Sequence, residues 1–133
     1  MPRLRQKKQT IILYDSDAEL AKNIKLYLED IYFVKIVSQP EQILSELSNR
    51  SYDFLISDFN SLNLQSRNLL DEIKTISPST KILLMCTFFD AEINNERFIL
   101  SKVDDYIFKP FNVNLLKNKL SGHFTSHKEV KFT

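Results

Sequence analysis

The stretch Phe54-Leu55-Ile56-Ser57-Asp58 is a short apolar run that ends on a carboxylate. Three other apolar runs lead in the same way to a polar, reactive side chain, namely Asp15, Thr87 and Lys109. In a parallel sheet the carboxyl ends of all strands open onto one edge, and ligands bind in the crevice there. If these runs are strands of such a sheet, the four side chains meet in one pocket.

Short apolar runs alternate with segments of helical periodicity along the chain. The expected strands are Thr10–Tyr14, Phe33–Val37, Phe54–Ser57, Lys81–Cys86 and Tyr106–Phe108. The expected apolar helix stripes are Leu20, Ile24, Tyr27, Leu28 and Ile31; Ile43, Leu44 and Leu47; Leu69, Leu70, Ile73 and Ile76; Ile93, Ile99 and Leu100; Val113, Leu116 and Leu120. Five such alternations predict an α/β fold, with a parallel sheet covered by helices on both faces.

Helix starts and stops are also marked. Capping boxes are expected at 16–19 (Ser-Asp-Ala-Glu) and at 38–41 (Ser-Gln-Pro-Glu), where Ser16 and Ser38 are the capping residues. Asp90 and Asn112 are further N-cap candidates, and Gly122 fits the end of the last helix.

Composition narrows the classes of protein. With 133 residues, 43% of them hydrophobic, the chain can bury one core, and no apolar run is long enough to span a membrane. The amino terminus lacks the apolar segment of a secretion signal, which favours a cytoplasmic location. A formal charge of +1 and a single glycine argue against nucleic acid, membrane surfaces and nucleotide cofactors as ligands. The lone Cys86, inside an apolar run, is expected to be a small buried side chain.

Over about residues 9–121 this layout resembles the receiver domain of two-component response regulators. The resemblance implies a doubly wound, five-stranded parallel sheet of order 2-1-3-4-5 in a flavodoxin-like (CheY-like) three-layer sandwich. It divides the chain into a basic flexible arm (1–9), a receiver domain (10–121) and a polar tail (122–133). No output domain is expected, so the protein acts as a lone receiver or the sequence is a piece of a longer one.

The resemblance also implies roles for individual residues. Asp58 corresponds to the phosphoacceptor, Thr87 to the hydroxyl that binds the phosphoryl group, and Lys109 to the lysine that pairs with Asp58. Tyr106 corresponds to the aromatic switch residue, although a half-buried strand tyrosine is an equal alternative. The Lys109-Pro110 bond corresponds to the family's cis peptide.

The partners that the resemblance implies are a histidine kinase or phosphotransfer protein, and a downstream protein. The downstream protein would bind the face formed by the fourth helix, the last strand and the fifth helix. A homodimer is left open. The leading hypothesis is therefore a signalling switch that is not an enzyme.

A magnesium site is implied at the same pocket. Its ligands would be the carboxylates of Asp15 and Asp58 and the main-chain carbonyl of Asn60, an oxygen set that suits Mg²⁺. Receivers usually place a second acidic residue directly after the first, and here that position is Ser16. Weaker Mg²⁺ binding is expected, and Asp17 is one residue too far along to replace the missing ligand fully.

Three other departures bear on phosphorylation. Phe88 stands where the family has a small residue, so access to the pocket is expected to be narrower. The loop after Asp58 lacks the usual proline and glycine. Lys102-Val103 replaces a Gly-Ala pair, which predicts backbone strain or a changed turn.

Two alternatives remain. A pseudo-receiver would keep the fold and act as a protein-interaction module that is independent of phosphorylation, which Ser16 and Phe88 favour. A phosphatase of the haloacid-dehalogenase type is a remote alternative, because Asp15-Ser16-Asp17 matches that family's Asp-x-Asp motif. Against the phosphatase, Asp58 would have no role in it.

Overall fold

The computed structural model describes residues 8–58, 64–86 and 101–123, with no side-chain description for 64–66. In these ranges the strands are β1 (Gln9–Tyr14), β2 (Tyr32–Val37), β3 (Phe54–Asp58), β4 (Lys81–Cys86) and β5 (Asp105–Phe108). The helices are α1 (Ala18–Leu28), α2 (Glu41–Asn49), α3 (Leu64–Ile76) and α5 (Val113–Ser121). Every expected strand is present, and its bounds differ from the prediction by one residue at most. The predicted helix stripe at Ile93, Ile99 and Leu100, with its cap Asp90, lies outside the described residues.

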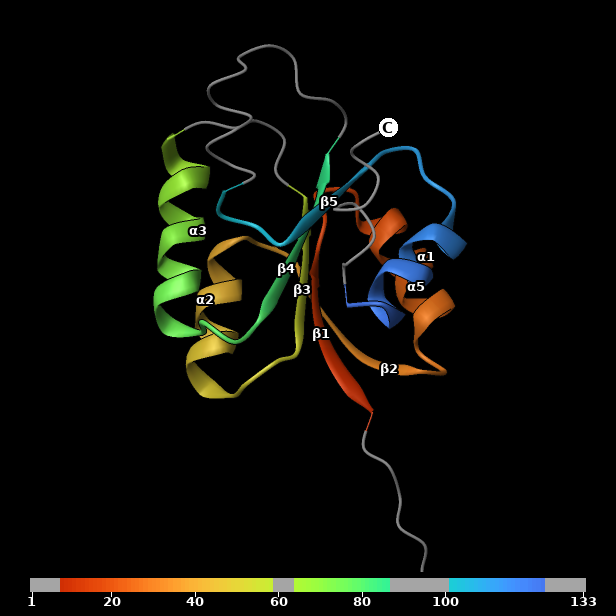
Figure 1. Cartoon of the computed structure of the whole chain (residues 1–133), viewed down its shortest axis with the longest axis horizontal. Coiled ribbons are helices and arrows are strands. Elements are labelled where there is room, and N and C mark those ends of the chain that lie inside the picture. The colour runs from red at the N-terminus through yellow and green to blue at the C-terminus, as the bar shows by residue number, and fades with distance from the viewer. Residues whose placement is uncertain (1–7, 59–63, 87–100, 124–133) are drawn as a thin grey trace, which may run out of the picture.

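The five strands form one parallel sheet of order β2-β1-β3-β4-β5, which confirms the predicted doubly wound topology. Helices α1 and α5 cover one face of the sheet, and α2 and α3 cover the other (Figure 1). One register row crosses the whole sheet through Val37, Tyr14, Ser57, Leu84 and Tyr106. The strands are therefore aligned so that their carboxyl ends share one edge.

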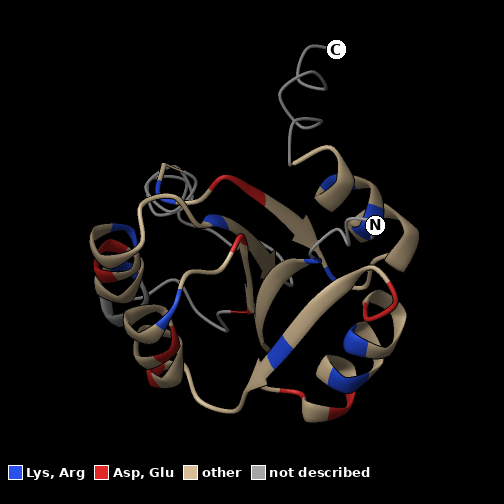
Figure 2. Ribbon diagram, turned by 90° about the horizontal axis from the view of Figure 1, so that it is seen from below, with Lys and Arg blue, Asp and Glu red and all other residues tan. Residues whose placement is uncertain are grey.

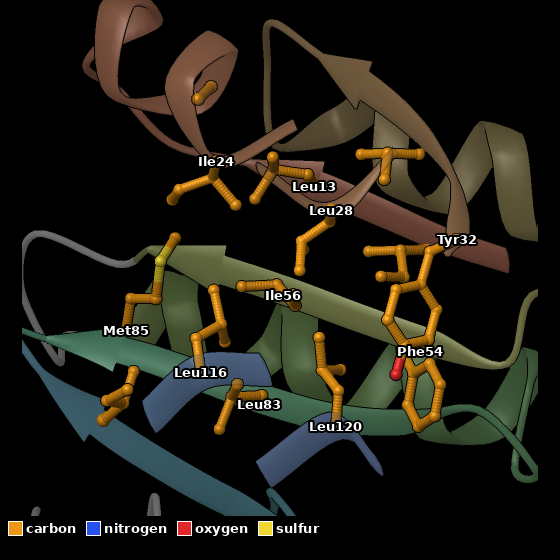
Figure 3. Packing of buried hydrophobic residues seen from close by; sticks show 14 residues of the cluster. Leu13, Ile24, Leu28, Tyr32, Phe54, Ile56, Leu83, Met85, Leu116 and Leu120 are labelled. Atoms are coloured by element: carbon orange, nitrogen blue, oxygen red, sulfur yellow. The ribbon is translucent and has the colours of Figure 1, made fainter. Parts of the chain in front are cut away.

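Each face of the sheet has its own apolar core. The core under α1 and α5 includes Leu13, Ile56, Leu83 and Leu116, which point toward one another in Figure 3. The core under α2 and α3 is built around Leu55 and its neighbours. Every residue of β3 is buried because the strand is central and covered on both sides. This packing fixes the position of Asp58 at the end of that strand.

Two residues of the predicted stripes are not in the core. Ile31 is 47% exposed because α1 ends at Leu28 and leaves Ile31 in the turn that leads to β2. Ile76 is 41% exposed at the last residue of α3. The other members of these two stripes for which burial is described are buried or partly buried.

The predicted capping boxes are wrong in detail. Asp17, not Ser16, is the N-cap of α1, and its Oδ1 accepts from the backbone N–H groups of the next turn. An aspartate caps as well as a serine does, so Ser16 is left free for another contact. At α2 the side chain of Gln42, not Glu41, accepts from the Ser38 region. The predicted caps at Asn112 and Gly122 are confirmed.

The turn at Lys102-Val103 shows no left-handed residue. Among the described residues that are not glycine, His123 alone has positive φ, at 53°. Of the two predicted outcomes, backbone strain or a changed turn, strain from a positive φ is absent, and side-chain contacts hold the turn. Lys102 pairs with Asp71 of α3 at 2.8 Å, and the carboxylate of Asp104 accepts from the N–H of Ile82 at 2.7 Å.

Acidic and basic residues both occur on the helices that cover each face of the sheet (Figure 2). No helix of the described segments is long and apolar enough to cross a membrane. Cys86 is buried, as predicted.

Candidate functional site

Three of the four predicted pocket residues come together at the carboxyl edge of the sheet. Asp15 follows β1, Asp58 ends β3 and Lys109 follows β5. Strands β1 and β3 are neighbours, so the two carboxylates lie side by side. The backbone of Lys109 lies farther from the two aspartates, because β4 stands between β3 and β5. The N–H of Lys109 continues the pairing of β5 with β4 by donating to the carbonyl of Cys86 at 2.7 Å. Its long side chain then reaches back to both carboxylates.

The ammonium of Lys109 pairs with both aspartates. Its Nζ lies 2.7 Å from Oδ2 of Asp15 and 3.3 Å from Oδ1 of Asp58. The sequence predicted a pairing with Asp58, and the structure shows that the contact with Asp15 is shorter. The side chains of Asp15 and Asp58 are 0% and 4% exposed. Two buried carboxyl groups thus face one ammonium group.

The pKa of Lys109 is raised despite its burial. Desolvation, the largest single effect, lowers the pKa because it disfavours the charged form. The hydrogen bond to Asp15, the charge of Asp58, the charge of Asp15 and the hydrogen bond to Asp58 all raise it, and together they prevail. The lysine is therefore held as an ammonium ion at neutral pH.

Ser16 contributes a contact that the sequence did not reveal. Its hydroxyl donates to Oδ2 of Asp58 at 3.1 Å, across 42 residues of sequence. Among the described residues, Lys109 thus contacts one oxygen of Asp58 and Ser16 donates to the other. Since Asp17 serves as the helix cap, it does not stand in for Ser16 at this carboxylate.

Tyr14 is a second neighbour of the two aspartates that the sequence analysis did not identify. It precedes Asp15 and pairs in register with Ser57, the residue before Asp58. Burial, and then the charges of Asp58 and Asp15, raise the pKa of its phenol. The signal that could have found it is its position beside both aspartates in adjacent strands.

Several predicted residues lie outside the described part of the chain. These are Thr87, the main-chain carbonyl of Asn60, and Phe88. Tyr106 is described and is half-buried, with its ring packed edge-to-face against Phe108 at 5.3 Å between centroids. The Lys109-Pro110 peptide bond is cis.

The side chains of the pocket partly fit a divalent cation. The described residues contain no group of three or more histidine, cysteine, aspartate or glutamate side chains that could hold a metal. The described side chains of the pocket offer two carboxylates as ligands for a cation, those of Asp15 and Asp58. Oδ2 of Asp15 is buried, and the ammonium of Lys109, 2.7 Å away, is the one cation that the described residues place beside it. Carboxylate oxygen is the ligand that a hard cation prefers, and such a cation retains several waters.

The model of the response regulator receiver domain matches residues 11–121 of the chain. The chain belongs to the receiver domain family. Receiver domains are generally signalling switches that interact with histidine kinases and downstream effectors, and they typically bind Mg²⁺ in an acidic pocket. In this chain the carboxylates of Asp15 and Asp58 lie together beside Lys109 at the carboxyl edge of the sheet.

Two curated relatives illustrate the match. The receiver domain is 31% identical over 114 residues to the heme response regulator HssR of Staphylococcus saprophyticus, covering 85% of this chain and 50% of that protein. The chain thus spans about half the length of that regulator. It is 28% identical over 130 residues to the chemotaxis protein CheY-3 of Vibrio cholerae, covering 93% of this chain and 98% of that protein.

Solved structures show the same fold. A CheY-like receiver domain protein from Methanospirillum hungatei superposes with a TM-score of 0.78 at 22% identity, over 92% of this chain and 98% of that one. The response regulator TrrA of Thermotoga maritima, solved in complex with Mg²⁺–BeF, superposes with a TM-score of 0.71 at 22% identity. That match covers 86% of this chain and 97% of TrrA.

Proposed function

We propose that the protein is a phosphorylation-dependent switch in which Asp58 accepts a phosphoryl group from a histidine kinase or phosphotransfer protein. The supporting observation is that Lys109 contacts both Asp58 and Asp15 at the carboxyl edge of the sheet. A carboxylate oxygen of Asp58 forms the new bond to phosphorus while the bond from phosphorus to the donor's imidazole nitrogen breaks. The freed imidazole takes up a proton from solvent.

Asp15 and Asp58, with the main-chain carbonyl of Asn60, would hold Mg²⁺, which when bound neutralises charge on the phosphoryl oxygens. Lys109 has a separate role in this proposal. Its ammonium, already 3.3 Å from Asp58, is placed to donate to the phosphoryl oxygens that replace the carboxylate charge. The phosphoryl group carries up to roughly two negative charges in place of the single charge of the carboxylate, and its oxygens would draw Lys109 and the hydroxyl of Thr87 inward.

The surface that reports the change is proposed to include β5 and α5. Tyr106 lies on β5, half-buried, and the loop that carries Lys109 joins β5 to α5. Movement of Lys109 toward a phosphorylated Asp58 therefore acts directly on this face, where the downstream protein would bind. Phosphorylation can shift the conformational equilibrium only by its differential interaction with the two states.

The division into a basic arm (1–9), a receiver domain (10–121) and a polar tail (122–133) belongs to the same proposal, as does a cytoplasmic location where a histidine kinase would meet the protein. In this proposal the protein is a switch and not a phosphatase. The buried Asp58, in contact with Lys109 and Ser16, has a defined role in the switch and none in the Asp-x-Asp phosphatase.

A pseudo-receiver is the second candidate, and the contact of Ser16 favours it. The hydroxyl of Ser16 occupies Oδ2 of Asp58 and contributes no charge for a cation. Because Ser16 and Lys109 already contact the two carboxylate oxygens of Asp58, the pocket can keep this arrangement without Mg²⁺. Such a protein would keep its interaction surface while Asp58 stayed unmodified.

Treatment with acetyl phosphate separates the two candidates. The protein is incubated with the donor and saturating Mg²⁺, and the mass of the intact chain is measured with and without EDTA. The switch predicts one Mg²⁺-dependent phosphoryl group, which is lost in Asp58→Asn because an amide is not a nucleophile. Wild-type protein that stays unmodified at saturating Mg²⁺ identifies the pseudo-receiver, whereas equal modification of Asp58→Asn shows that another residue is the acceptor.

A further inference from the structure

A groove lies between α2 and α3, away from the pocket of Asp58. Its volume is about 460 Å³, within the range of ligand sites in proteins. The lining residues are Leu44, Ser48, Asp71, Glu72, Thr75 and Ile76. Helices α2 and α3 lie side by side on one face of the sheet (Figure 1), and each runs from the carboxyl edge back toward the opposite edge. The α3 side of the groove comes from the second half of that helix, far along from Asp58.

The two hydroxyl groups of the groove are already satisfied within their own helices. The hydroxyl of Ser48 donates to the carbonyl of Leu44 at 2.8 Å. The hydroxyl of Thr75 donates to the carbonyl of Asp71 at 2.9 Å. The apolar lining of the groove therefore comes from Leu44 and Ile76, and Ile76 remains 41% exposed. Covering Ile76 with another apolar side chain would be favourable because it removes apolar area from water.

The charges on the groove are all acidic among its described lining residues. Asp71 has a side chain that is 49% exposed and pairs through Oδ1 with Lys102. Glu72 is exposed, and no ion pair joins it to any residue in the described segments. The nearby Lys74 is turned toward Asp104, at 3.7 Å, and is not part of the lining. An apolar lining beside the carboxylate of Glu72 is complementary to a ligand that is both apolar and cationic.

We propose that the α2–α3 groove binds a basic amphipathic helix of a partner protein. A whole helix, which is about 10–12 Å in diameter, does not enter a groove of this volume. Only side chains from one face of the partner helix would enter it. One or more apolar side chains of the partner pack on Leu44 and Ile76, and a lysine or arginine one helical turn away pairs with Glu72. Asp71 offers its second oxygen to the same cation. Because the groove lies apart from Asp58, this docking does not require phosphorylation.

The test selects ligands without assuming their sequence. A displayed library of random 16-residue peptides is panned against the full chain, and binders that also recognise the double variant Glu72→Lys/Ile76→Ser are removed. The proposal expects survivors rich in lysine or arginine and in leucine or phenylalanine. Selection that yields no survivors, or acidic survivors, overturns it.

One surviving peptide is then synthesised and its Kd is measured by fluorescence anisotropy. Glu72→Lys and Ile76→Ser should each weaken binding by about tenfold or more, one decade in Kd. The matched controls are Asp30→Lys, an exposed acid after α1, and Leu26→Ser, an exposed leucine of α1 on the other face of the sheet. Equal weakening by a control overturns the assignment to this groove, provided that thermal unfolding shows each variant folded.

The proposed function and this docking fail separately. Asp58→Asn should bind the peptide with an unchanged Kd, while it loses modification by acetyl phosphate. A higher Kd for the Asp58→Asn variant would show that the peptide binds at the phosphorylation pocket and not in the groove.

Discussion

Ser16 donates its hydroxyl hydrogen to Oδ2 of Asp58 at 3.1 Å, so the residue that departs from the family pattern is in direct contact with the proposed phosphoacceptor. A charged side chain at this position would point at the same carboxylate. Position 16 therefore controls how many negative charges the pocket presents to a cation, and the helix cap is not involved because Asp17 provides it.

Ser16→Asp should strengthen Mg²⁺ binding. The added carboxylate gives a hard cation a third charged oxygen, and we expect the Kd for Mg²⁺ to fall by about tenfold, or roughly 1.4 kcal/mol. Without metal the same variant should be less stable than wild type, because three carboxylates then share the ammonium of Lys109. Isothermal titration with Mg²⁺ and urea unfolding with EDTA measure the two effects. Ser16→Asn, which adds no charge, is the control, and an unchanged Kd in Ser16→Asp would show that position 16 does not face the cation.

Lys109→Met should destabilise the fold strongly in the absence of metal. It leaves the buried carboxylates of Asp15 and Asp58 side by side with no cation, and breaking a buried pair costs about 3 kcal/mol or more. Lys102→Met breaks an exposed pair with Asp71 and should cost about 0.5 kcal/mol. Urea unfolding compares them. In an Asp15→Asn background the effect of Lys109→Met should shrink, and a loss of equal size in both backgrounds would contradict the role of charge.

Tyr52 should make stability depend on pH in the alkaline range. Burial, its hydrogen bond to Glu46 and the charge of Glu46 raise the pKa of its phenol from 10.0 to about 12. A raised pKa in the folded state means that the contribution is fully present below pH 10 and is lost as pH rises through about 12. Tyr52→Phe should flatten the stability profile across this window, and Glu46→Gln should flatten it partly. Urea unfolding at several pH values measures this, and an unchanged slope in Tyr52→Phe would assign the effect to other groups.

Tyr52→Phe should also lower stability at neutral pH. The hydroxyl of Tyr52 donates to Oε1 of Glu46 at 2.8 Å, and its loss is expected to cost about 1 kcal/mol. A change in the midpoint of urea unfolding at constant m-value measures this effect. No change would mean that the bond is exchanged for water without net cost.

Lys119→Met should destabilise the attachment of α5 to the sheet. Nζ of Lys119 lies 2.8 Å from Oδ2 of Asp105, whose side chain is 0% exposed. Loss of the cation leaves a buried carboxylate partly uncompensated, which is expected to cost about 3 kcal/mol. On the same helix, Lys117→Met removes a cation 4.7 Å from the ring centroid of Tyr27 and should cost about 0.5–1 kcal/mol. If the two variants unfold at the same urea concentration, the Lys119–Asp105 pair is not a structural anchor.

The sequence predicted the site at the level of backbone positions. Each strand is a local apolar run, and the residue at its end is placed by topology, so Asp15, Asp58 and Lys109 could be brought to one edge before any contact was known. The cap of α1 was predicted one residue too early because Ser16 and Asp17 are both good caps, and only the φ and ψ angles at the turn distinguish them.

By itself the sequence determined the parallel sheet, its order through the family resemblance, and the edge at which the charged residues gather. Local periodicity and strand topology are properties of short segments, so they can be read directly from the chain. Only the tertiary structure decided that Lys109 lies closer to Asp15 than to Asp58, that Ser16 bonds to Asp58, and that α2 and α3 leave an acidic-sided groove. These contacts join residues far apart in the chain, and they depend on how long side chains and neighbouring helices pack over a finished sheet, which no local pattern records.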